Sequence, residues 1–394
     1  MHRAKAFVCS SKPFVSLLLL TPGLCFAVPP SAAGTTGSTC LAWTGSQPPS
    51  PGTSVSILSA VSTLSSCSAW AVGHDSGGSS TSTLTERWNG VGWAAVPSPN
   101  PSPLYNWLYG VTELSTTDAW AVGASSNGAA DQTLIEHWNG SSWKVVPSPD
   151  PGGATNSNDL YSVAAASAKD VWAVGAHYIS RSVVETLIEH WNGSVWSDVK
   201  SPDPAGSASE NELEAVAVTS SSNAWAVGDY YKGAAHETLI AHWNGSVWAA
   251  VKSKSPSSQS FLDGISATSA KNAWAVGNST SGGVNKTLIE HWNGVAWSDV
   301  PSPDRGTSDN DLLGVASSSA SSAFAVGEYH SGATFRTLVE HWNGAAWAIV
   351  ASPNPGSGTN AVFAGVSAGS PTNVWSVGDD NVGRVIEAAA FHCC

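Results

Sequence analysis

The sequence has few charged residues, and basic residues are especially scarce. Of its 394 residues 11% are charged, with 16 Lys and Arg against 29 Asp and Glu. Binding to nucleic acid needs clustered Lys and Arg that displace counterions, and anionic membrane surfaces attract the same residues. The composition therefore argues against both as partners.

Long apolar runs are also missing, and no stretch reaches the 18 apolar residues that a membrane span needs. The apolar run Phe14–Leu20 is short and follows basic residues, which is typical of a signal peptide cleaved after Ala27. We therefore expect residues 1–27 to be a signal peptide and residues 28–40, rich in Pro, Gly, Ser and Thr, to be a flexible linker. The protein would then be secreted, and extracellular or held at the cell surface, without membrane insertion.

Removing the leader makes the chain still more acidic. Arg3, Lys5 and Lys12 lie before Ala27 and no acidic residue does, so 13 basic residues remain against 29 acidic ones, a charge near −16. Methionine is almost absent, with one residue, whereas there are 20 Trp. So many tryptophans in a chain of this length indicate a packing role that is repeated.

A repeat with a period near 50 residues accounts for the tryptophans. The core WAVG, once FAVG and once WSVG, recurs at steps of 50, 52, 53, 49, 50 and 51 residues, and the word HWNG or RWNG follows six of the copies. This period is typical of a propeller or another repeat array. The seven WAVG cores begin at Trp70, Trp120, Trp172, Trp225, Trp274, Phe324 and Trp375.

Each complete copy predicts four short strands. In the second copy these are Leu108–Leu114, Ala119–Val122, Thr133–Trp138 and Trp143–Val146. The loop 124–132 separates the middle two, and Asn-Gly, a strong hairpin signal, separates the last two. Four antiparallel strands per repeat are the blade of a β-propeller. We therefore predict an all-β, seven-bladed β-propeller that occupies residues 41–394 as a single domain; a right-handed solenoid of strands is the alternative fold.

The two ends of the repeat region complement each other. Leu41–Ser46 resembles a fourth strand without its first three, whereas the last copy has only three strands, the third at Arg384–Ala389. We expect the N-terminal strand to complete the seventh blade beside Arg384–Ala389 and so to close the ring, which would cover an open edge. Asp118, Asp170, Asn223, Asn272 and Asn373 precede the second strands, and we expect their side chains to bond the backbone two residues on.

Four cysteines remain after the leader and allow three full pairings. Cys40 aligns with Gly90, in the turn between third and fourth strands, and Ala390-Phe391 is assigned to the matching place in the last copy. We therefore expect a disulfide between Cys40 and Cys393 or Cys394, since export supplies an oxidising route. Pairing with Cys67 and free thiols stay open as alternatives.

With these elements assigned, the chain resembles bacterial secreted propellers built from WAVG…TLIEHWNG…W…PSP repeats. More loosely it resembles kelch-type propellers, including that of galactose oxidase. The resemblance covers Leu41 to Ala389 and departs from kelch in having the single Gly123 where kelch has a pair. It implies export and a binding scaffold, and says little about the ligand.

The repeated polar and aromatic residues are interpreted as structural. Four near-identical Glu-His sites in one ring are implausible as catalytic centres, and adjacent strand residues point to opposite faces. We expect Glu-His to form a hydrogen-bonding ladder between blades. The Trp residues beside the Asn-Gly turn and at the start of the fourth strand are expected to pack between blades, with sugar stacking in the outer grooves as the alternative.

No cofactor, metal or catalytic residue is predicted. The acidic loops near Asp159 and Asp311 lack a complete calcium-loop spacing. Repeats two to six contain no Cys for the crosslink of galactose oxidase, and the Arg residues that a sialidase would cluster fall in different blades.

Binding is expected on the face that carries the loops between strands two and three and between strands four and one, because these loops vary. They hold aromatic and acidic residues in no fixed register, and aromatic platforms beside carboxylates suit glycans or proteins. Packing within their own loops is the plain alternative. The candidate ligand-binding residues are Tyr105, Trp107, Asp159, His177, Tyr178, Asp229, Tyr230, Tyr231, Asp311, Tyr329 and His330.

Three functions remain open at this point. The first is a secreted, monomeric, non-enzymatic propeller that recognises extracellular glycans or a surface protein. The second is a carbohydrate-active hydrolase or lyase, which needs carboxylates such as Asp159, Asp229 and Asp311 to converge at the ring mouth. The third is a purely architectural extracellular protein.

Overall fold

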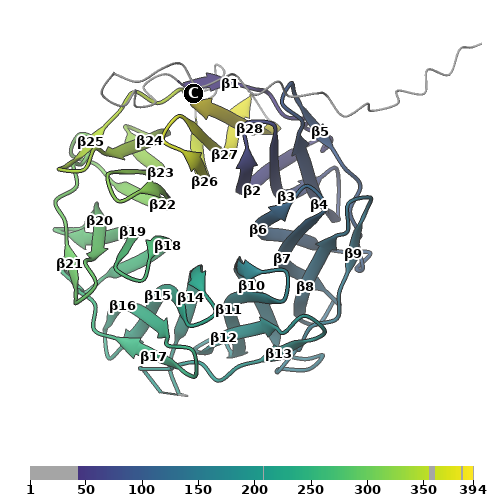
Figure 1. Cartoon of the computed structure of the whole chain (residues 1–394), viewed down its shortest axis with the longest axis horizontal. Coiled ribbons are helices and arrows are strands. Elements are labelled where there is room, and N and C mark those ends of the chain that lie inside the picture. Colours follow the sequence, from purple (N-terminus) through teal and green to yellow (C-terminus); the bar gives the residue numbers. More distant parts are fainter. Residues whose placement is uncertain (1–42, 207, 355–359, 383–384, 394) are drawn as a thin grey trace, which may run out of the picture.

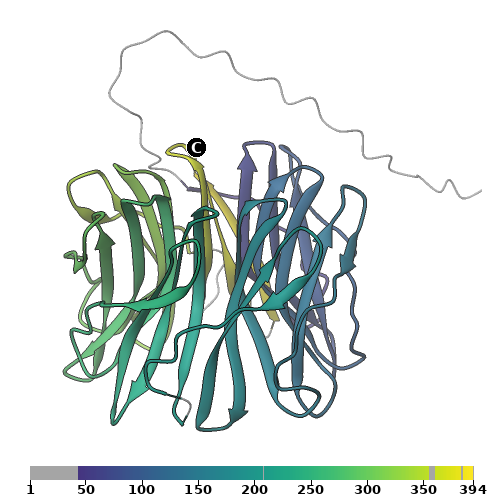
Figure 2. The same ribbon diagram turned by 60° about the horizontal axis from the view of Figure 1, so that its bottom comes forward.

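A computed structural model describes residues 43–206, 208–354, 360–382 and 385–393 of the chain. These residues form 28 β-strands and no helix, which confirms the all-β prediction. Figure 1 shows the strands grouped in small sheets around a central space, and Figure 2 shows them running from one face of the molecule to the other. Leu41 and Ala42 of the predicted N-terminal strand, the leader, the linker, Cys40 and Cys394 lie outside the described residues.

The strands repeat in the order expected, four to a blade. The first strands are β2 (Val55–Ser65), β6 (Asn106–Ser115), β10 (Ser157–Ser167), β14 (Asn211–Ser220), β18 (Ser260–Ser269), β22 (Asn310–Ser319) and β26 (Ala361–Ser370). The second strands are β3 (Ser68–Ser76), β7 (Asp118–Ser126), β11 (Asp170–Ser180), β15 (Asn223–Lys232), β19 (Asn272–Ser281), β23 (Ser322–Ser331) and β27 (Asn373–Val382). The third strands are β4 (Thr81–Trp88), β8 (Asp131–Trp138), β12 (Val183–Trp191), β16 (Ala235–Trp243), β20 (Val284–Trp292), β24 (Thr334–Trp342) and β28 (Val385–Cys393). The fourth strands are β5 (Trp93–Ala95), β9 (Trp143–Val145), β13 (Trp196–Asp198), β17 (Trp248–Val251), β21 (Trp297–Asp299), β25 (Trp347–Ile349) and, at the other end of the chain, β1 (Trp43–Gly45).

Seven blades fit the sheet topology. Blades two to six are separate four-stranded antiparallel sheets, β6–β9, β10–β13, β14–β17, β18–β21 and β22–β25. Blade one, β2–β5, and blade seven, β26–β28 with β1, belong to one eight-stranded sheet. A single parallel pairing, Val55 with Ile386, joins these two blades. In blade two the loop predicted at 124–132 is shorter than expected, because β7 continues to Ser126 and β8 begins at Asp131.

The N-terminal strand pairs with the last strand, but further along than predicted. Trp43 pairs with Cys393 and Gly45 with Phe391, so the partner is not Arg384–Ala389. The third strand was predicted to end too early, at Ala389, because the last copy lacks the Glu and Trp of EHWNG by which the strand end is recognised in the other copies. Its histidine is nevertheless present: His392 pairs with Trp375 as His137 pairs with Trp120. Ala390 and Phe391 therefore lie inside β28 and not in a turn, and Cys393 occupies the place of the missing Trp.

The two faces of the molecule are defined by which connections they carry. The indole Nε1 of Trp138 donates to the carbonyl oxygen of Thr116 at 3.2 Å, which holds the turn after β8 against the turn after β6. On the opposite face Asn127 Nδ2 donates to the Ala154 carbonyl oxygen at 3.1 Å, joining the β7–β8 loop to the β9–β10 connection. We call the first face the turn face and the second the variable-loop face.

The Asn and the Gly of the turns on the turn face have different roles. Only the glycine has positive φ, +90° at Gly140, and no other residue type does so among those described. The side-chain Oδ1 of Asn139 instead accepts hydrogen bonds from the backbone N–H groups of Ser141 and Ser142 at 3.0 and 3.1 Å. The asparagine is thus required for its acceptor and not for positive φ.

Tryptophans from neighbouring blades interlock to form the core. Trp70 of blade one is fully buried, and its ring centroid lies 4.9 Å from each of Trp138 and Trp143 of blade two. Equivalent trios occupy the next interfaces, such as Trp120 with Trp191 and Trp196. The packing interpretation is confirmed: in blades one to six the tryptophan that opens the fourth strand exposes at most 9% of its surface, and the one beside the Asn-Gly turn contacts the tryptophan of the preceding blade. Of the tryptophans beside the turn only Trp138 is buried, and the others are half-buried.

The Asp or Asn at the start of the second strand in five blades was predicted to bond the backbone, but its side chain bonds the repeated histidine. His137 Nε2 lies 2.8 Å from Asp118 Oδ1, and His242 Nε2 lies 2.9 Å from Asn223 Oδ1. The imidazole also packs on the WAVG indole, at 4.3 Å between the centroids of His137 and Trp120. The residue before the second strand therefore binds the histidine across the hairpin and does not close an Asx turn. The same bond recurs at His190–Asp170, His291–Asn272 and His392–Asn373.

The repeated glutamate does not form the expected ladder. Its side chain is fully buried in five blades, and in Glu86, Glu136 and Glu189 neither carboxyl oxygen has a hydrogen-bond partner. Only two members reach the preceding blade: Glu290 accepts from the Lys254 backbone N–H and Glu340 from the Ser302 hydroxyl. Burial raises the pKa of four of these carboxyls to about 8, those of Glu86, Glu136, Glu290 and Glu340, and raises the pKa of Glu189 well above its usual range.

These buried carboxyls predict a loss of stability at alkaline pH. Because their folded-state pKa exceeds the ordinary 4.5, their contribution is complete below pH 4.5 and is lost as the pH rises through about 8. Each pKa unit corresponds to roughly 1.4 kcal/mol at one site. Glu189→Gln should therefore raise the melting temperature at pH 8 and have little effect at pH 4.5, as measured by differential scanning calorimetry. Glu185→Gln, in the half-exposed part of the same strand, is the control, and equal responses of the two variants would contradict the interpretation.

Candidate functional site: the central channel

One residue in every first strand is displaced from the sheet by a β-bulge. In blade two the register passes from Leu108, opposite Gly123, to Gly110, opposite Val122, so Tyr109 is left unpaired. Gly123 is the glycine of WAVG, and a Cβ there would lie 2.0 Å from the carbonyl oxygen of Trp107. The glycine thus permits the close approach at which the first strand bulges. The bulged residues are Ser59, Tyr109, Tyr161, Glu214, Asp263, Leu313 and Ala364.

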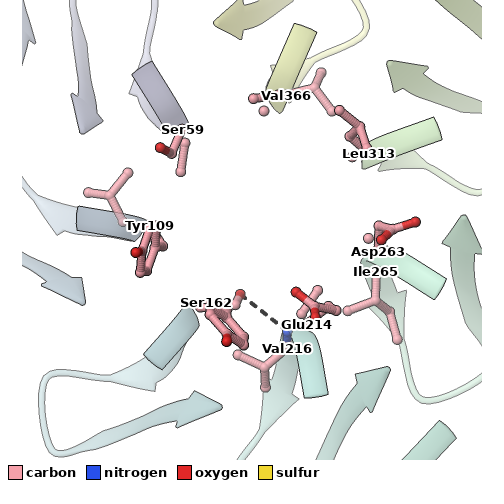
Figure 3. A pocket seen from close by; sticks show the side chains of 18 of the residues that line it. Ser59, Tyr109, Ser162, Glu214, Val216, Asp263, Ile265, Leu313 and Val366 are labelled. Atoms are coloured by element: carbon pink, nitrogen blue, oxygen red, sulfur yellow. Dashed lines mark hydrogen bonds between the residues drawn. The ribbon is translucent and has the colours of Figure 1, made fainter. Parts of the chain in front are cut away.

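The bulged residues line a small channel at the centre of the molecule, of roughly 210 Å³. The next residue of each strand is small, and a Cβ on Gly110 would lie 2.9 Å from Ser162 Cα of the neighbouring blade. The first strands therefore approach each other closely, and Ser162 Oγ accepts the Val216 backbone N–H of the next blade at 3.2 Å. Figure 3 shows this bond and the bulged side chains around the opening.

Blades two and three give the channel an aromatic side. The rings of Tyr109 and Tyr161 lie 5.8 Å apart, and the hydroxyls of Tyr161 and Tyr178 share a hydrogen bond of 2.6 Å. Burial raises the pKa of Tyr109 and Tyr161 far above the ordinary value, helped by Asp159 and Asp131 at Tyr109 and by Tyr178 and Asp159 at Tyr161, so both remain neutral. Earlier in the same part of the chain, at the start of β6, the rings of Tyr105 and Trp107 stack at 5.4 Å and 7°. Tyr105 is 40% exposed, so this second aromatic pair reaches solvent at the variable-loop face.

Blades four and five give the channel an acidic side. Figure 3 shows Glu214 and Asp263 on the first strands of neighbouring blades, with Asp263 across the opening from Tyr109. The Asp263 Oδ2 atom is buried and has no hydrogen-bond partner. Burial, then the charges of Asp229 and Asp311, raises the pKa of Asp263 to about 7. Burial, then the charges of Asp263, Glu212 and Asp229, raises the pKa of Glu214 well above its usual range.

The acidic region continues from the channel towards the variable-loop face. Burial and neighbouring carboxylates raise the pKa of Asp159 and of Glu328 to about 7. Two of the carboxylates have polar partners: Asp229 Oδ2 lies 2.8 Å from His236 Nδ1, and Asp311 Oδ1 accepts Asn285 Nδ2 at 2.9 Å. The region thus contains more negative charge than the groups around it balance.

The three aspartates named from the sequence border the acidic region of the channel. Asp159, Asp229 and Asp311 are partly buried, and each interacts electrostatically with carboxylates of the channel region, Asp159 with Glu212 and the other two with Asp263. They lie on three different blades, the third, the fourth and the sixth.

The predicted aromatic residues form separate local pairs. Tyr105 stacks on Trp107, Tyr178 bonds Tyr161, and Tyr231 packs against His236 at 5.0 Å. In the remaining cases Tyr230 donates to Glu237, the Arg305 guanidinium lies 4.9 Å from the Tyr329 ring, His330 packs on Phe335, and His177 lines a second hollow with Glu185 and Asp198.

The bulged residues Tyr109, Tyr161, Glu214 and Asp263 were not predicted from the sequence. Each lies inside a strand, where core residues are expected and not a site. A signal was nevertheless present: in the aligned repeats these residues follow a constant Leu, as in Leu108-Tyr109 and Leu213-Glu214, and vary widely from blade to blade. A variable column between constant ones on a first strand indicates a residue that faces the channel.

The described part of the chain shows neither a group of metal ligands nor a membrane-spanning helix. No group of three or more His, Cys, Asp or Glu side chains in this part of the chain is arranged to hold a metal ion. Within the same residues there is no helix with the length and apolar character of a membrane span.

Comparison with known proteins identifies the fold and no family. No protein-family model matches the sequence, and no curated protein matches it. Among solved structures the chain is similar to YCF48 bound to a D1 peptide, with 15% identity, a TM-score of 0.56 and coverage of 91% of this chain and 100% of that one. It is also similar to a PL25 ulvan lyase bound to a GlcA-Rha3S saccharide (10% identity, TM-score 0.51, 89% and 93% coverage). A third is the GH74 xyloglucanase of Xanthomonas campestris (12%, 0.53, 88% of this chain and 55% of that one).

The electrostatic coupling in the channel can be measured directly. In a pH titration followed by 13C NMR, the Asp263 carboxyl should titrate near pH 7, because it is buried beside Asp229 and Asp311. Asp229→Asn should lower this midpoint by removing the carboxylate whose charge raises the pKa of Asp263 most. Asp198→Asn, in β13 of blade three, should leave it unchanged. A midpoint below pH 5 in the unmodified protein would contradict the described environment.

Proposed function

We propose that this protein is a secreted recognition propeller that binds an extracellular glycan at the mouth of its channel, on the variable-loop face. The observation that carries the proposal is the two-sided wall, with tyrosines on blades two and three and carboxyls on blades four and five. The stacked pair Tyr105 and Trp107 lies on the same blade as Tyr109, at the variable-loop face. Aromatic rings stack on the apolar faces of sugars. Partly protonated carboxyls both donate and accept hydrogen bonds, which suits the hydroxyl groups of a glycan.

Export and membership of the WAVG/HWNG repeat propellers belong to the same proposal. They rest on the leader-like residues 1–27 and on the repeat words themselves. The ulvan lyase and the xyloglucanase show that proteins of similar fold handle polysaccharides. The YCF48 complex shows that a similar fold binds a peptide, so an extracellular protein is the other partner to test, with a surface pull-down alongside a glycan array.

A hydrolase or lyase is the second candidate, and the channel carboxyls favour it. A glycosidase needs one carboxyl that is protonated near neutral pH and a second that is ionised. The raised pKa values of Glu214 and Asp263 supply the first requirement. Release of reducing ends from the glycan that the array identifies, abolished by Glu214→Gln, would replace recognition by catalysis as the function.

The stacked pair Tyr105 and Trp107 at the variable-loop face should contribute much of the glycan affinity. Tyr105→Ala and Trp107→Ala should each weaken binding by roughly 3- to 10-fold, because stacked aromatic contacts contribute about 0.5–1.5 kcal/mol. Isothermal titration calorimetry with the glycan from the array measures the change. Val295→Ala is the control, since Val295 is 83% exposed in a β20–β21 turn on the opposite face. Unchanged affinity in both aromatic variants would contradict this location.

We also propose that the N-terminal strand closes the ring. Beyond its pairing with β28, Trp43 packs against Phe324 of blade six and Phe363 of blade seven, with centroids 6.1 and 6.2 Å apart. Ser46 N donates to the Ala390 carbonyl oxygen at 3.0 Å, and Gln47 Nε2 to that of Ala388 at 3.0 Å. Cys393, one of the cysteines of the expected clasp, is fully buried beside this strand, and neither it nor Cys67 is without a partner.

Deleting residues 41–46 tests this closure. The deletion should lower the free energy of unfolding by at least about 3 kcal/mol, the usual cost of removing a packed aromatic side chain, as measured by chemical denaturation under reducing conditions. Deletion of residues 29–34 in the linker is the matched control. Mass spectrometry of unreduced peptides tests the covalent clasp separately, and Cys40 joined to neither Cys393 nor Cys394 would show that it is wrong.

A further inference from the structure

The channel contains acidic groups without a matching cation. Among the described residues that line it there is no Lys, Arg or His, whereas Glu214 and Asp263 stand on adjacent blades. The Asp263 Oδ2 atom is buried and makes no hydrogen bond. A buried carboxyl oxygen without a donor is costly unless a ligand supplies one.

The geometry points to a binding site for a primary ammonium group between Glu214 and Asp263, and we propose that an unsubstituted amino sugar of the glycan carries it. The sugar part of this inference rests on the proposed function, whereas the ammonium part does not. An ammonium group has three donors, which matches a site with carboxylates on two adjacent blades.

The rest of the channel wall suits such a group. Tyr109 and Tyr161 on the aromatic side offer ring faces, which attract cations when water is excluded. Leu313 and Ile265, which Figure 3 places beside Asp263, offer apolar contact to the carbon skeleton beside the nitrogen. The wall therefore complements a group that is part cation and part apolar.

The electrostatic surroundings predict that this binding depends on pH. Glu212 and Asp229 of blade four, Asp263 of blade five and the neutral hydroxyls of Tyr161 and Tyr178 surround Glu214. Asp229 and Asp311 act in the same way on Asp263. His236 partly offsets the rise in the pKa of Asp229 and of Glu212, and His330 partly offsets that of Asp311. An ammonium ligand must displace protons from these carboxyls, so its affinity should rise between pH 5 and pH 7 and fall with added salt.

Calorimetric titration with three probes tests the inference. Glucosamine oligosaccharides should bind at least 10-fold more tightly at pH 7 than the same oligomers of N-acetylglucosamine, which carry no charge. Spermidine, an ammonium ligand without a sugar, should compete with the glucosamine oligomers. Binding should release protons, which titrations in two buffers of different ionisation enthalpy detect without any variant.

Variants locate the site. Glu214→Gln and Asp263→Asn should each weaken binding of the glucosamine oligomer at least 10-fold and remove the preference over the acetylated one. Asp198→Asn makes the same change of charge outside the channel and should bind normally.

The possible outcomes separate the inference from the proposed function. Equal binding of charged and acetylated oligomers overturns the ammonium site and leaves glycan recognition standing. Binding of spermidine, but of no glycan, supports the ammonium site and overturns glycan recognition. Silence from every probe, or normal binding by both channel variants, overturns the inference.

Discussion

The insertion of one tryptophan between two tryptophans of the next blade, at six of the seven interfaces, is the contact on which the architecture depends. Each hydrophobic cluster combines residues of two blades, as when Trp70 and Val72 of blade one join Trp138 and Trp143 of blade two. Among the described residues no cluster lies within a single blade, so each blade is stable only beside a neighbour. At the remaining interface both sides of the contact differ: Cys393 replaces the HWNG tryptophan, and Phe324 replaces the WAVG tryptophan of the facing blade.

Two sets of carboxyls have a raised pKa because of burial, but they differ in how they can respond to their surroundings. The glutamates between blades are fully buried among apolar residues, and burial dominates their pKa. The pKa of each channel carboxyl is also raised by the charge of neighbouring carboxylates. The first set responds only to pH, because nothing can enter a packed interface. The second lines an open space, where a ligand can take the place of the proton.

The repeat words predicted most of the fold because they specify local structure. WAVG and HWNG fix which residues enter a hairpin, and each hairpin keeps its partners within one period of the sequence. The last copy was misplaced at Arg384–Ala389 because AAAFHC retains only the histidine of EHWNG, and its other positions changed together with the facing blade. Glu136 was assigned partners because its polarity implied them, whereas its burial is decided by the neighbouring blade. The channel was missed because Tyr109, Glu214 and Asp263 meet only through packing of blades that lie about 50 residues or more apart.

The pairing of β1 with β28 also has a consequence for the order of events during synthesis. Thr44 bonds the backbone of His392, 348 residues later in the chain. At a synthesis rate of about 5–20 residues per second, roughly 17–70 s separate the appearance of the two strands. Throughout that time the first strand to emerge has an unsatisfied edge and an exposed tryptophan, while blades one to six complete their own hairpins. The final blade is therefore assembled last from the oldest and the newest parts of the chain, and this interval is when the chain most needs protection from pairing with another molecule.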